Sequence, residues 1–376
     1  MAKDIVILLD GTSNEISRKR TNVLRLYGCL EKSERQLVYY DPGVGTIGAE
    51  DAWSRVRRWL AELWGMATGW GLDANVKEAY RFLVERYEEG DRIWLMGFSR
   101  GAYTARVLAG FLHAFGLIRS EQLNLLDYAY RAYKGIGQKS GEAAFAEIRL
   151  HERSLRPEKV EIAGLALMDT VASVIEPAGF GVRLANHAYT SNNPSVRSLR
   201  HAVSIDERRA MYRATLWGGE REWRKPFAAP GTGEPQDARE LWFAGVHGDV
   251  GGGMPEAESA LGKLPLLWLI EETAALGVRY RTQTVNRLVR GTVAGTDYVA
   301  PDAGADLHAS LKGGWWILEL VPGRDPGAPG RRFLGLTWPL GAWRRIPEGA
   351  ELHPSVAERM ARRPDYRPPN LPGKAE

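Results

Sequence analysis

The sequence has a single cysteine, Cys29, among its 376 residues. One cysteine can form neither a disulfide within the chain nor a cysteine-rich metal site, so cross-links of both kinds are excluded. A lone cysteine usually packs as a small apolar side chain, and we expect Cys29 to lie in the core.

Long apolar runs are also missing. No stretch reaches the roughly 20 apolar residues that are needed to span a bilayer. The first apolar run, in MAKDIVILLDGT, is too short for a signal peptide with its cleavage site and is better interpreted as the first strand of the fold. We therefore expect a protein that is cytoplasmic as made, and export without a signal peptide stays open.

The chain carries little excess charge, with a formal net charge of +4. It contains no run of Lys and Arg and no motif that is typical of DNA or RNA recognition, so we expect no nucleic-acid partner. A mild positive charge is compatible with anionic substrates and with peripheral contact to a membrane surface.

What the sequence does contain is a series of short buried-strand patterns separated by helical ones. Near-continuous apolar runs of this kind are typical of a parallel sheet that is covered on both faces. Helical spacing is found at 75–90, 101–116 and 259–277, and the alternation predicts a mostly parallel, doubly wound α/β fold with helical and loop insertions. The predicted strands are 3–10, 36–41, 92–98, 161–169, 200–206 and 240–247.

The predicted organisation is one large domain over 1–300 and a C-terminal extension, 301–376, that packs on the same domain. Residues 53–64, rich in Trp and Arg, have the spacing of an amphipathic helix. Such a helix either packs on the core or forms part of a lid over 48–70 that could meet a lipid surface.

One of the predicted strands ends in a motif that can carry chemistry. Residues 97–101 read GFSRG, which fits the G-x-S-x-G pattern, with a strand before it and a helix after it. In this arrangement a sharp strand-to-helix turn presents the serine hydroxyl at the edge of the sheet. We therefore predict that Ser99 is a nucleophile, against the alternative of a plain glycine-flanked turn.

A serine nucleophile needs a general base, and a histidine usually follows it in the chain. His247 ends the predicted strand 240–247 and precedes GDVGGG, a glycine-rich loop that could bring it over the sheet. We predict His247 as the base. His201 lies inside a predicted strand and is expected to be structural, while His308 and His353 are expected to take part in loop packing.

The acid that supports the histidine is less closely defined. Asp169 and Asp206 both close predicted strands between Ser99 and His247. The acid of such hydrolases usually follows the second strand after the one that bears the serine, which favours Asp206 and leaves Asp169 as the alternative, with Asp249 a further candidate.

An oxyanion hole needs two N–H donors. The backbone of Arg100 is one candidate, and Gly11 or Thr12, after the first strand, is the other. A D-x-D phosphatase motif is absent from this loop, and GDVGGG is misplaced for a dinucleotide fingerprint, so no metal or other cofactor is expected.

Several segments resemble, in order, an α/β-hydrolase family of formerly unknown function that includes type VI secretion phospholipase effectors. The resemblance spans at least residues 5–275. The matching segments are LLDGT (8–12), DPGVGT (41–46), GLDANVKEAYRFL (71–83), GDRIWLMGFSRGAYTARVLAGFL (90–112), DTV (169–171), HAVSIDERR (201–209) and LWFAGVHGDVGGGMPEAESAL (241–261).

The resemblance implies an α/β-hydrolase-like serine hydrolase that cleaves carboxylic esters, with phospholipase A activity in characterised members. It implies Ser99 as nucleophile, His247 as base and Asp206 as acid, an ester or phospholipid substrate, and leaves open a secretion adaptor or an immunity protein as partner. The alternative is a non-catalytic binding protein that keeps the same fold, because fold alone does not fix function.

Overall fold

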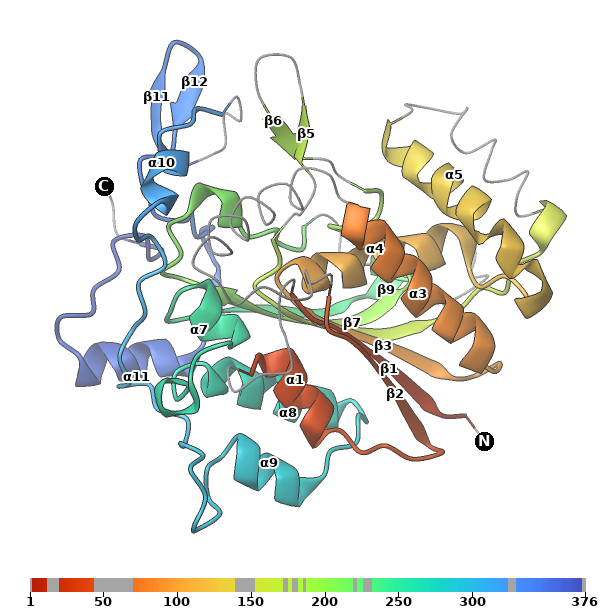
Figure 1. Ribbon diagram of the computed structural model, residues 1–376, viewed down its shortest axis with the longest axis horizontal. Helices are drawn as coiled ribbons and strands as arrows, with labels where there is room; N and C mark the ends of the chain where they lie inside the picture. Colours follow the sequence, from red (N-terminus) through yellow and green to blue (C-terminus); the bar gives the residue numbers. More distant parts are fainter. Residues whose placement is uncertain are drawn as a thin grey trace, which may run out of the picture.

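A parallel sheet runs through the middle of the protein (Figure 1). The structure is a computed structural model that describes residues 2–11, 20–43, 70–138, 153–171, 175–177, 182–184, 187–218, 222–225, 232–323 and 329–373. Within these residues the sheet has seven strands in the order β13-β10-β7-β4-β3-β1-β2, and all neighbouring strands are parallel. The strands are β1 (Asp4–Leu9), β2 (Gln36–Asp41), β3 (Arg92–Phe98), β4 (Ile162–Met168), β7 (Val196–Ser204), β10 (Asp237–Phe243) and β13 (Glu351–Leu352).

Each of the six predicted strands corresponds to one of these, so the prediction of a parallel α/β sheet is confirmed. The seventh strand, β13, is only two residues long and pairs with Leu241 and Trp242 of β10. A pair this short carries neither an apolar run nor an alternating pattern, which is why the sequence did not reveal it.

Helices cover both faces of the sheet because successive strand residues point to opposite sides. Ile5, Ile7 and Leu9 of β1 face α3, α4 and α5, while Val6 and Leu8 face α1, α8 and α9. The helices are α1 (Asn22–Cys29), α3 (Trp70–Arg86), α4 (Arg100–Phe115), α5 (Leu126–Gln138), α8 (Lys263–Ala275) and α9 (Thr282–Leu288).

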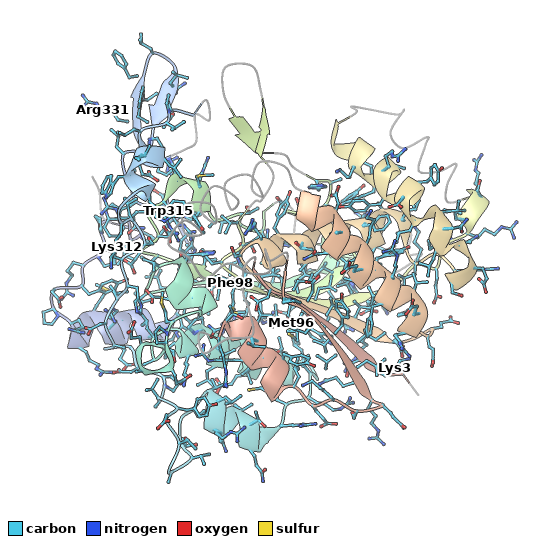
Figure 2. All side chains as sticks on the ribbon, viewed as in Figure 1. Lys3, Met96, Phe98, Lys312, Trp315 and Arg331 are labelled. Carbon is cyan, nitrogen blue, oxygen red and sulfur yellow. The ribbon has the colours of Figure 1, made fainter. Side chains whose placement is uncertain are left out.

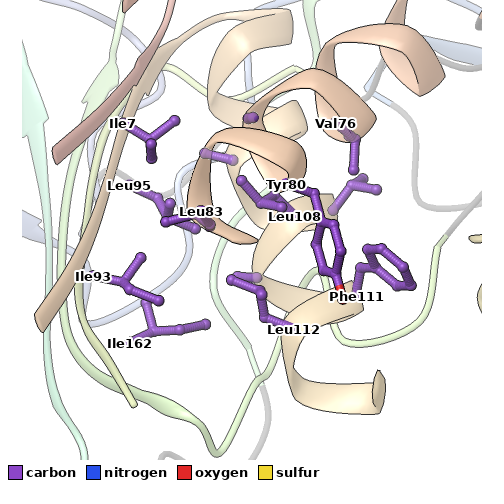
Figure 3. Packing of buried hydrophobic residues seen from close by; sticks show 14 of the residues in the cluster. Ile7, Val76, Tyr80, Leu83, Ile93, Leu95, Leu108, Phe111, Leu112 and Ile162 are labelled. Atoms are coloured by element: carbon purple, nitrogen blue, oxygen red, sulfur yellow. The ribbon is translucent and has the colours of Figure 1, made fainter. Parts of the chain in front are cut away.

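The packing on the α3 and α4 face is drawn in Figure 3. There Ile7, Ile93 and Leu95 of the sheet lie opposite the apolar stripes of the two helices. On the other face Cys29 is fully buried, as expected, and burial raises the pKa of its thiol to about 12. A thiol this hard to ionise is a packing group rather than a reactive one.

Residues beyond 300 pack against the same sheet. Val356, Tyr366 and Leu371 form a cluster with Val203 and Trp242 of the sheet. The remaining elements are small: α7 (His247–Gly251), α10 (Trp315–Glu319), α11 (Pro354–Arg362), the 3₁₀ helices η1 (Ser120–Leu125), η2 (Ala210–Tyr212) and η3 (Glu256–Glu258), and the hairpins β5 (Ile175–Pro177)–β6 (Val182–Leu184), β8 (Glu222–Trp223)–β9 (Glu234–Pro235) and β11 (Arg331–Phe333)–β12 (Leu336–Trp338).

The lid predicted over 48–70 and the amphipathic helix over 53–64 lie outside the described residues, apart from Trp70, the first residue of α3. Among the helices that the structure does describe, none combines the length and the apolar character that a membrane span requires.

Helix α4 starts unusually close to the end of β1, and two glycines make this possible. A Cβ atom on Gly101 would lie 2.1 Å from the carbonyl oxygen of Leu9 and 2.5 Å from that of Asp10. A Cβ on Gly97 would lie 2.7 Å from the backbone of Ala102 and of Gly101. Backbone atoms cannot swing aside as a flexible side chain can, so both positions require glycine.

Gly101→Ala is therefore expected to lower the free energy of unfolding by about 3 kcal/mol, because the added methyl group overpacks a rigid contact. The matched control is Gly135→Ala in α5, where a Cβ meets nothing within 4 Å. This change should raise the free energy of unfolding by about 0.5–1 kcal/mol through helix propensity. Urea unfolding followed by circular dichroism measures both, and a Gly101→Ala protein as stable as the wild type contradicts the packing described.

Candidate active site

Ser99 occupies a sharp turn between β3 and α4. The strand ends at Phe98, the helix begins at Arg100, and Ser99 between them has φ 58° and ψ −122°. A positive φ is rare for a residue with a side chain. This strained strand-to-helix turn has the geometry expected of a nucleophile elbow.

His247 reaches this serine from the end of β10. It is the first residue of the short helix α7, where the sequence had indicated a loop, and its Nε2 lies 2.8 Å from Ser99 Oγ. The ring is held between two aromatic side chains, Phe98 at 4.6 Å and Tyr212 at 4.8 Å between ring centroids. The predicted pair of Ser99 and His247 is therefore brought together in space.

The carboxylate bonded to His247 is that of Asp169, with Nδ1 2.5 Å from Oδ2. The prediction that Asp206 fills this place is wrong. Asp206 accepts hydrogen bonds from the Gly245 N–H at 2.7 Å and the Tyr366 hydroxyl at 2.8 Å instead. The reason lies in the topology: Asp169 follows β4, which is paired directly with the serine strand β3, whereas Asp206 follows β7, one strand further away.

An arginine from the C-terminal part of the chain holds Asp169 in place. Nη1 of Arg344 lies 2.6 Å from Asp169 Oδ1, and Nη2 lies 3.0 Å from Oδ2. Nη1 also donates to Ser204 Oγ at 2.7 Å, and Nη2 donates to the carbonyl of Tyr212. Such a two-pronged pair fixes the plane of the carboxylate as well as its position.

These contacts decide the charges of the site. Burial by itself raises the pKa of Asp169, but the nearby Arg344 and the hydrogen bond from His247 outweigh it and keep that pKa well below its ordinary value. Burial lowers the pKa of the His247 imidazole, and Asp169 offsets only part of this effect. At neutral pH the pair is thus an ionised carboxylate and a neutral imidazole, with the ring proton on Nδ1 and Nε2 able to accept the proton of Ser99.

An ion pair between Glu207 and Arg209 holds the backbone of His247. Glu207 Oε2 accepts the N–H of His247 at 3.2 Å, and the guanidinium of Arg209 donates twice to the Glu207 carboxylate, each time at 2.9 Å. Burial raises the pKa of Glu207, but Arg209 outweighs this effect and brings the pKa to about 2. The Arg209 guanidinium also lies over the rings of Tyr212, at 3.6 Å, and of Trp315, at 4.8 Å.

The three residues predicted to donate an N–H to the oxyanion hole, Arg100, Gly11 and Thr12, are placed differently. Arg100 is the first residue of α4, directly after Ser99, as the motif requires. The N–H of Gly11 donates to Asp10 Oδ1 at 2.7 Å, so in this conformation that donor is already engaged. Thr12 lies outside the described residues. Asp10 is buried and also accepts from the hydroxyls of Thr21, at 2.5 Å, and Tyr40, at 3.0 Å.

The other acid and base candidates have partners elsewhere. His201 lies 2.7 Å from Glu240 and is fully buried, in agreement with a structural role. Asp249, the third candidate acid, is bonded to His308 at 2.5 Å. In the described part of the chain, no cluster of three His, Cys, Asp or Glu side chains could hold a metal ion.

Sequence reasoning missed Arg344 and did not single out Glu207 or Arg209. Arg344 is separated from Asp169 by 175 positions and lies in a segment without regular structure. No local signal distinguishes it from its neighbour Arg345. In the segment DERR (206–209) only Asp206 was singled out, as the predicted acid, whereas the carboxylate bonded to His247 is that of Asp169.

The fold and the site together define an α/β-hydrolase-like protein with a strained strand-to-helix turn at Ser99. The chain belongs to the family described as "T6SS, Phospholipase effector Tle1-like, catalytic domain", whose model matches residues 3–272.

A curated relative is the "Uncharacterized protein YEL023C" of Saccharomyces cerevisiae, which is 34% identical over 226 residues. The matched region makes up 56% of this chain but only 32% of that protein, so the chain spans about a third of this relative. Two solved structures are also similar. One is a crystal structure of an uncharacterized protein from Pseudomonas aeruginosa, which is 20% identical. The match covers 74% of this chain and 46% of the Pseudomonas chain, with a TM-score of 0.40. The Tle1 effector bound to the VgrG spike from the Type 6 secretion system is 16% identical, with 69% and 53% covered and a TM-score of 0.33.

Removal of the arginine should expose how strongly the site depends on it. Arg344→Met leaves the buried carboxylate of Asp169 without its cationic partner. The free energy of unfolding at pH 7 is therefore expected to fall by about 3–5 kcal/mol. The matched control Arg345→Met changes an exposed neighbour and should stay within about 0.5 kcal/mol of the wild type. Urea unfolding gives both values.

The pH dependence of this loss has a defined sign. In wild type the lowered pKa of Asp169 adds stability that is present above the ordinary carboxyl pKa of about 4 and disappears as the pH falls below it. Without Arg344 the pKa of Asp169 rises, so the carboxyl is neutralised as the solution is acidified. The stability gap between wild type and Arg344→Met should therefore narrow from pH 7 toward pH 4, and a constant gap contradicts the account.

Proposed function

We propose that this protein is a serine hydrolase that cleaves the carboxylic esters of phospholipids through an acyl-enzyme. The observation that carries the proposal is the hydrogen-bonded row Ser99–His247–Asp169, which starts on a strained turn at the carboxyl end of strand β3. Membership of a phospholipase effector family supports the lipid character of the substrate.

In the proposed reaction Ser99 Oγ attacks the ester carbonyl while Nε2 of His247 takes the hydroxyl proton. The Nδ1–H of the resulting imidazolium stays bonded to Asp169, whose negative charge stabilises the ring. The protonated histidine then gives its proton to the leaving alcohol, which in a phospholipid is the lysophospholipid. A water molecule repeats the sequence on the acyl-enzyme and releases the fatty acid.

The negative charge on the tetrahedral carbonyl oxygen needs N–H donors. We propose the backbone N–H of Arg100, at the start of α4, as one of them, because the partial positive charge of a helix start favours an anion there. The second donor is proposed to come from the loop after β1. Since the Gly11 N–H is held by Asp10, its use requires this hydrogen bond to open, and Thr12 is the neighbouring candidate.

The two strand-end aspartates provide a matched test of the mechanism. Asp169→Asn should lower kcat by about 10,000-fold, because the amide no longer holds the imidazole in the right tautomer. Asp206→Asn changes another buried carboxyl, which bonds Gly245 and Tyr366, and it should lower kcat by less than about tenfold in folded protein. Hydrolysis of a soluble short-chain ester measures both, with Ser99→Ala as the inactive reference, and a reversed order of the two losses overturns the assignment.

The activity should also report the titration of His247. The base acts only when neutral, so kcat/KM falls as the pH drops through its pKa, which burial places below the ordinary value of about 6.5. A pH profile with its acidic midpoint clearly below pH 6.5 is expected. A midpoint above 7 contradicts the charge state described for the site.

A further inference from the structure

Most of the exposed large hydrophobic side chains in the described residues lie in one segment of the chain. Nine large hydrophobic residues are exposed among the described residues, and seven of them lie between positions 316 and 340. Leu334 is 84% exposed and Ile317 64%. We call this set the apolar cap; it consists of Trp316, Ile317, Leu320, Val321, Phe333, Leu334 and Leu340.

The cap is one surface rather than scattered side chains. It spans α10 and the hairpin β11–β12, which project together from one end of the molecule (Figure 1). Gly323, just after α10, exchanges two backbone hydrogen bonds with Thr337 of β12, and the Leu340 N–H donates to the Glu319 carbonyl. Contiguous exposed apolar patches of this kind mark interaction sites, because apolar surface is unfavourable in water and is buried when a partner binds.

Among the described residues between 312 and 340, the exposed charged side chains are all cationic. They are Lys312, Arg331 and Arg332, and Figure 2 places Arg331 on the projecting hairpin and Lys312 at its base, below Trp315 in the view. The acidic side chain of the described part of this segment, Glu319, is 1% exposed and turned inward, where it accepts the N–H groups of Ala210 and Gly341. An apolar surface with a cationic rim complements a bilayer that contains anionic lipids.

The cap is physically linked to the proposed active site. Trp315, on the same short helix as Trp316 and Ile317, packs edge-on against Tyr212 at 5.5 Å between ring centroids. Tyr212 in turn packs edge-on against His247 at 4.8 Å. Trp315 of α10 is therefore linked to His247 through the ring of Tyr212, while Trp316 and Ile317 of the same helix are exposed.

We propose that the apolar cap docks the protein on the surface of a bilayer containing anionic phospholipid and so presents the site to its lipid substrate. The proposal rests on the proposed function for its purpose, but the binding itself is independent of catalysis. A second copy of the chain is a poorer occupant, because a symmetric contact between two caps brings their cationic rims together.

Binding is tested with the Ser99→Ala variant, so that no lipid is consumed. This protein should sediment together with vesicles of phosphatidylcholine that contain about 30% phosphatidylglycerol. The bound fraction should fall as the salt concentration is raised. Adding Ile317→Gln and Leu334→Asn should weaken binding at least tenfold; asparagine suits the positive φ of Leu334. The control Tyr128→Gln, an exposed aromatic outside the cap, should bind like the parent.

The rim is tested separately from the cap. Lys312→Gln with Arg331→Gln and Arg332→Gln should remove the preference for phosphatidylglycerol vesicles over pure phosphatidylcholine. In protein with Ser99 intact, the Ile317→Gln/Leu334→Asn change should leave hydrolysis of a soluble short-chain ester unchanged while hydrolysis of vesicle lipid falls. Unchanged soluble activity also shows that the doubly substituted protein is folded.

Three results overturn the docking proposal: no sedimentation of the Ser99→Ala protein with vesicles, equal sedimentation of the cap variant, or a dimer that the cap variant breaks without any vesicle binding. Failure of the proposed function looks different. In that case the intact protein cleaves neither soluble ester nor vesicle lipid, although the cap still binds the vesicles.

Discussion

The buried carboxylate of Asp169 is the group on which the rest of the site depends. It receives the imidazole of His247 on one oxygen, the backbone N–H of Ser204 on the other, and both prongs of Arg344. A buried charge without such partners would be neutralised or would weaken the fold. The same contacts that make this charge tolerable also fix the orientation of the histidine toward Ser99.

This constraint explains why the C-terminal part of the chain belongs to the site. Arg344 comes from an irregular segment that is held against the sheet by the short strand β13 and by Ile346, Val356 and Tyr366. Tyr366 bonds Asp206, and His308 bonds Asp249 of α7. Two of the aspartates that the sequence offered as catalytic are thus used to attach this part of the chain around the histidine.

Much of the fold was readable from the sequence, because the strands of a buried parallel sheet are short apolar runs and the elbow motif is local. The contact between Ser99 and His247 was predicted for that reason. The carboxylate that bonds His247 was not, since Asp169 and Asp206 have the same local pattern and differ only in which of their strands lies beside β3. Arg344 could not be found at all, because its role arises from a contact across 175 positions with no periodic pattern to announce it.

The central claim is that the row Ser99–His247–Asp169 makes Ser99 a nucleophile. The most direct measurement is reaction of the folded protein with a fluorophosphonate, followed by mass spectrometry of its peptides. The account predicts one adduct per chain, on Ser99, formed far more slowly in Asp169→Asn than in Asp206→Asn. Absence of an adduct in folded protein, or an adduct on another residue, would contradict it.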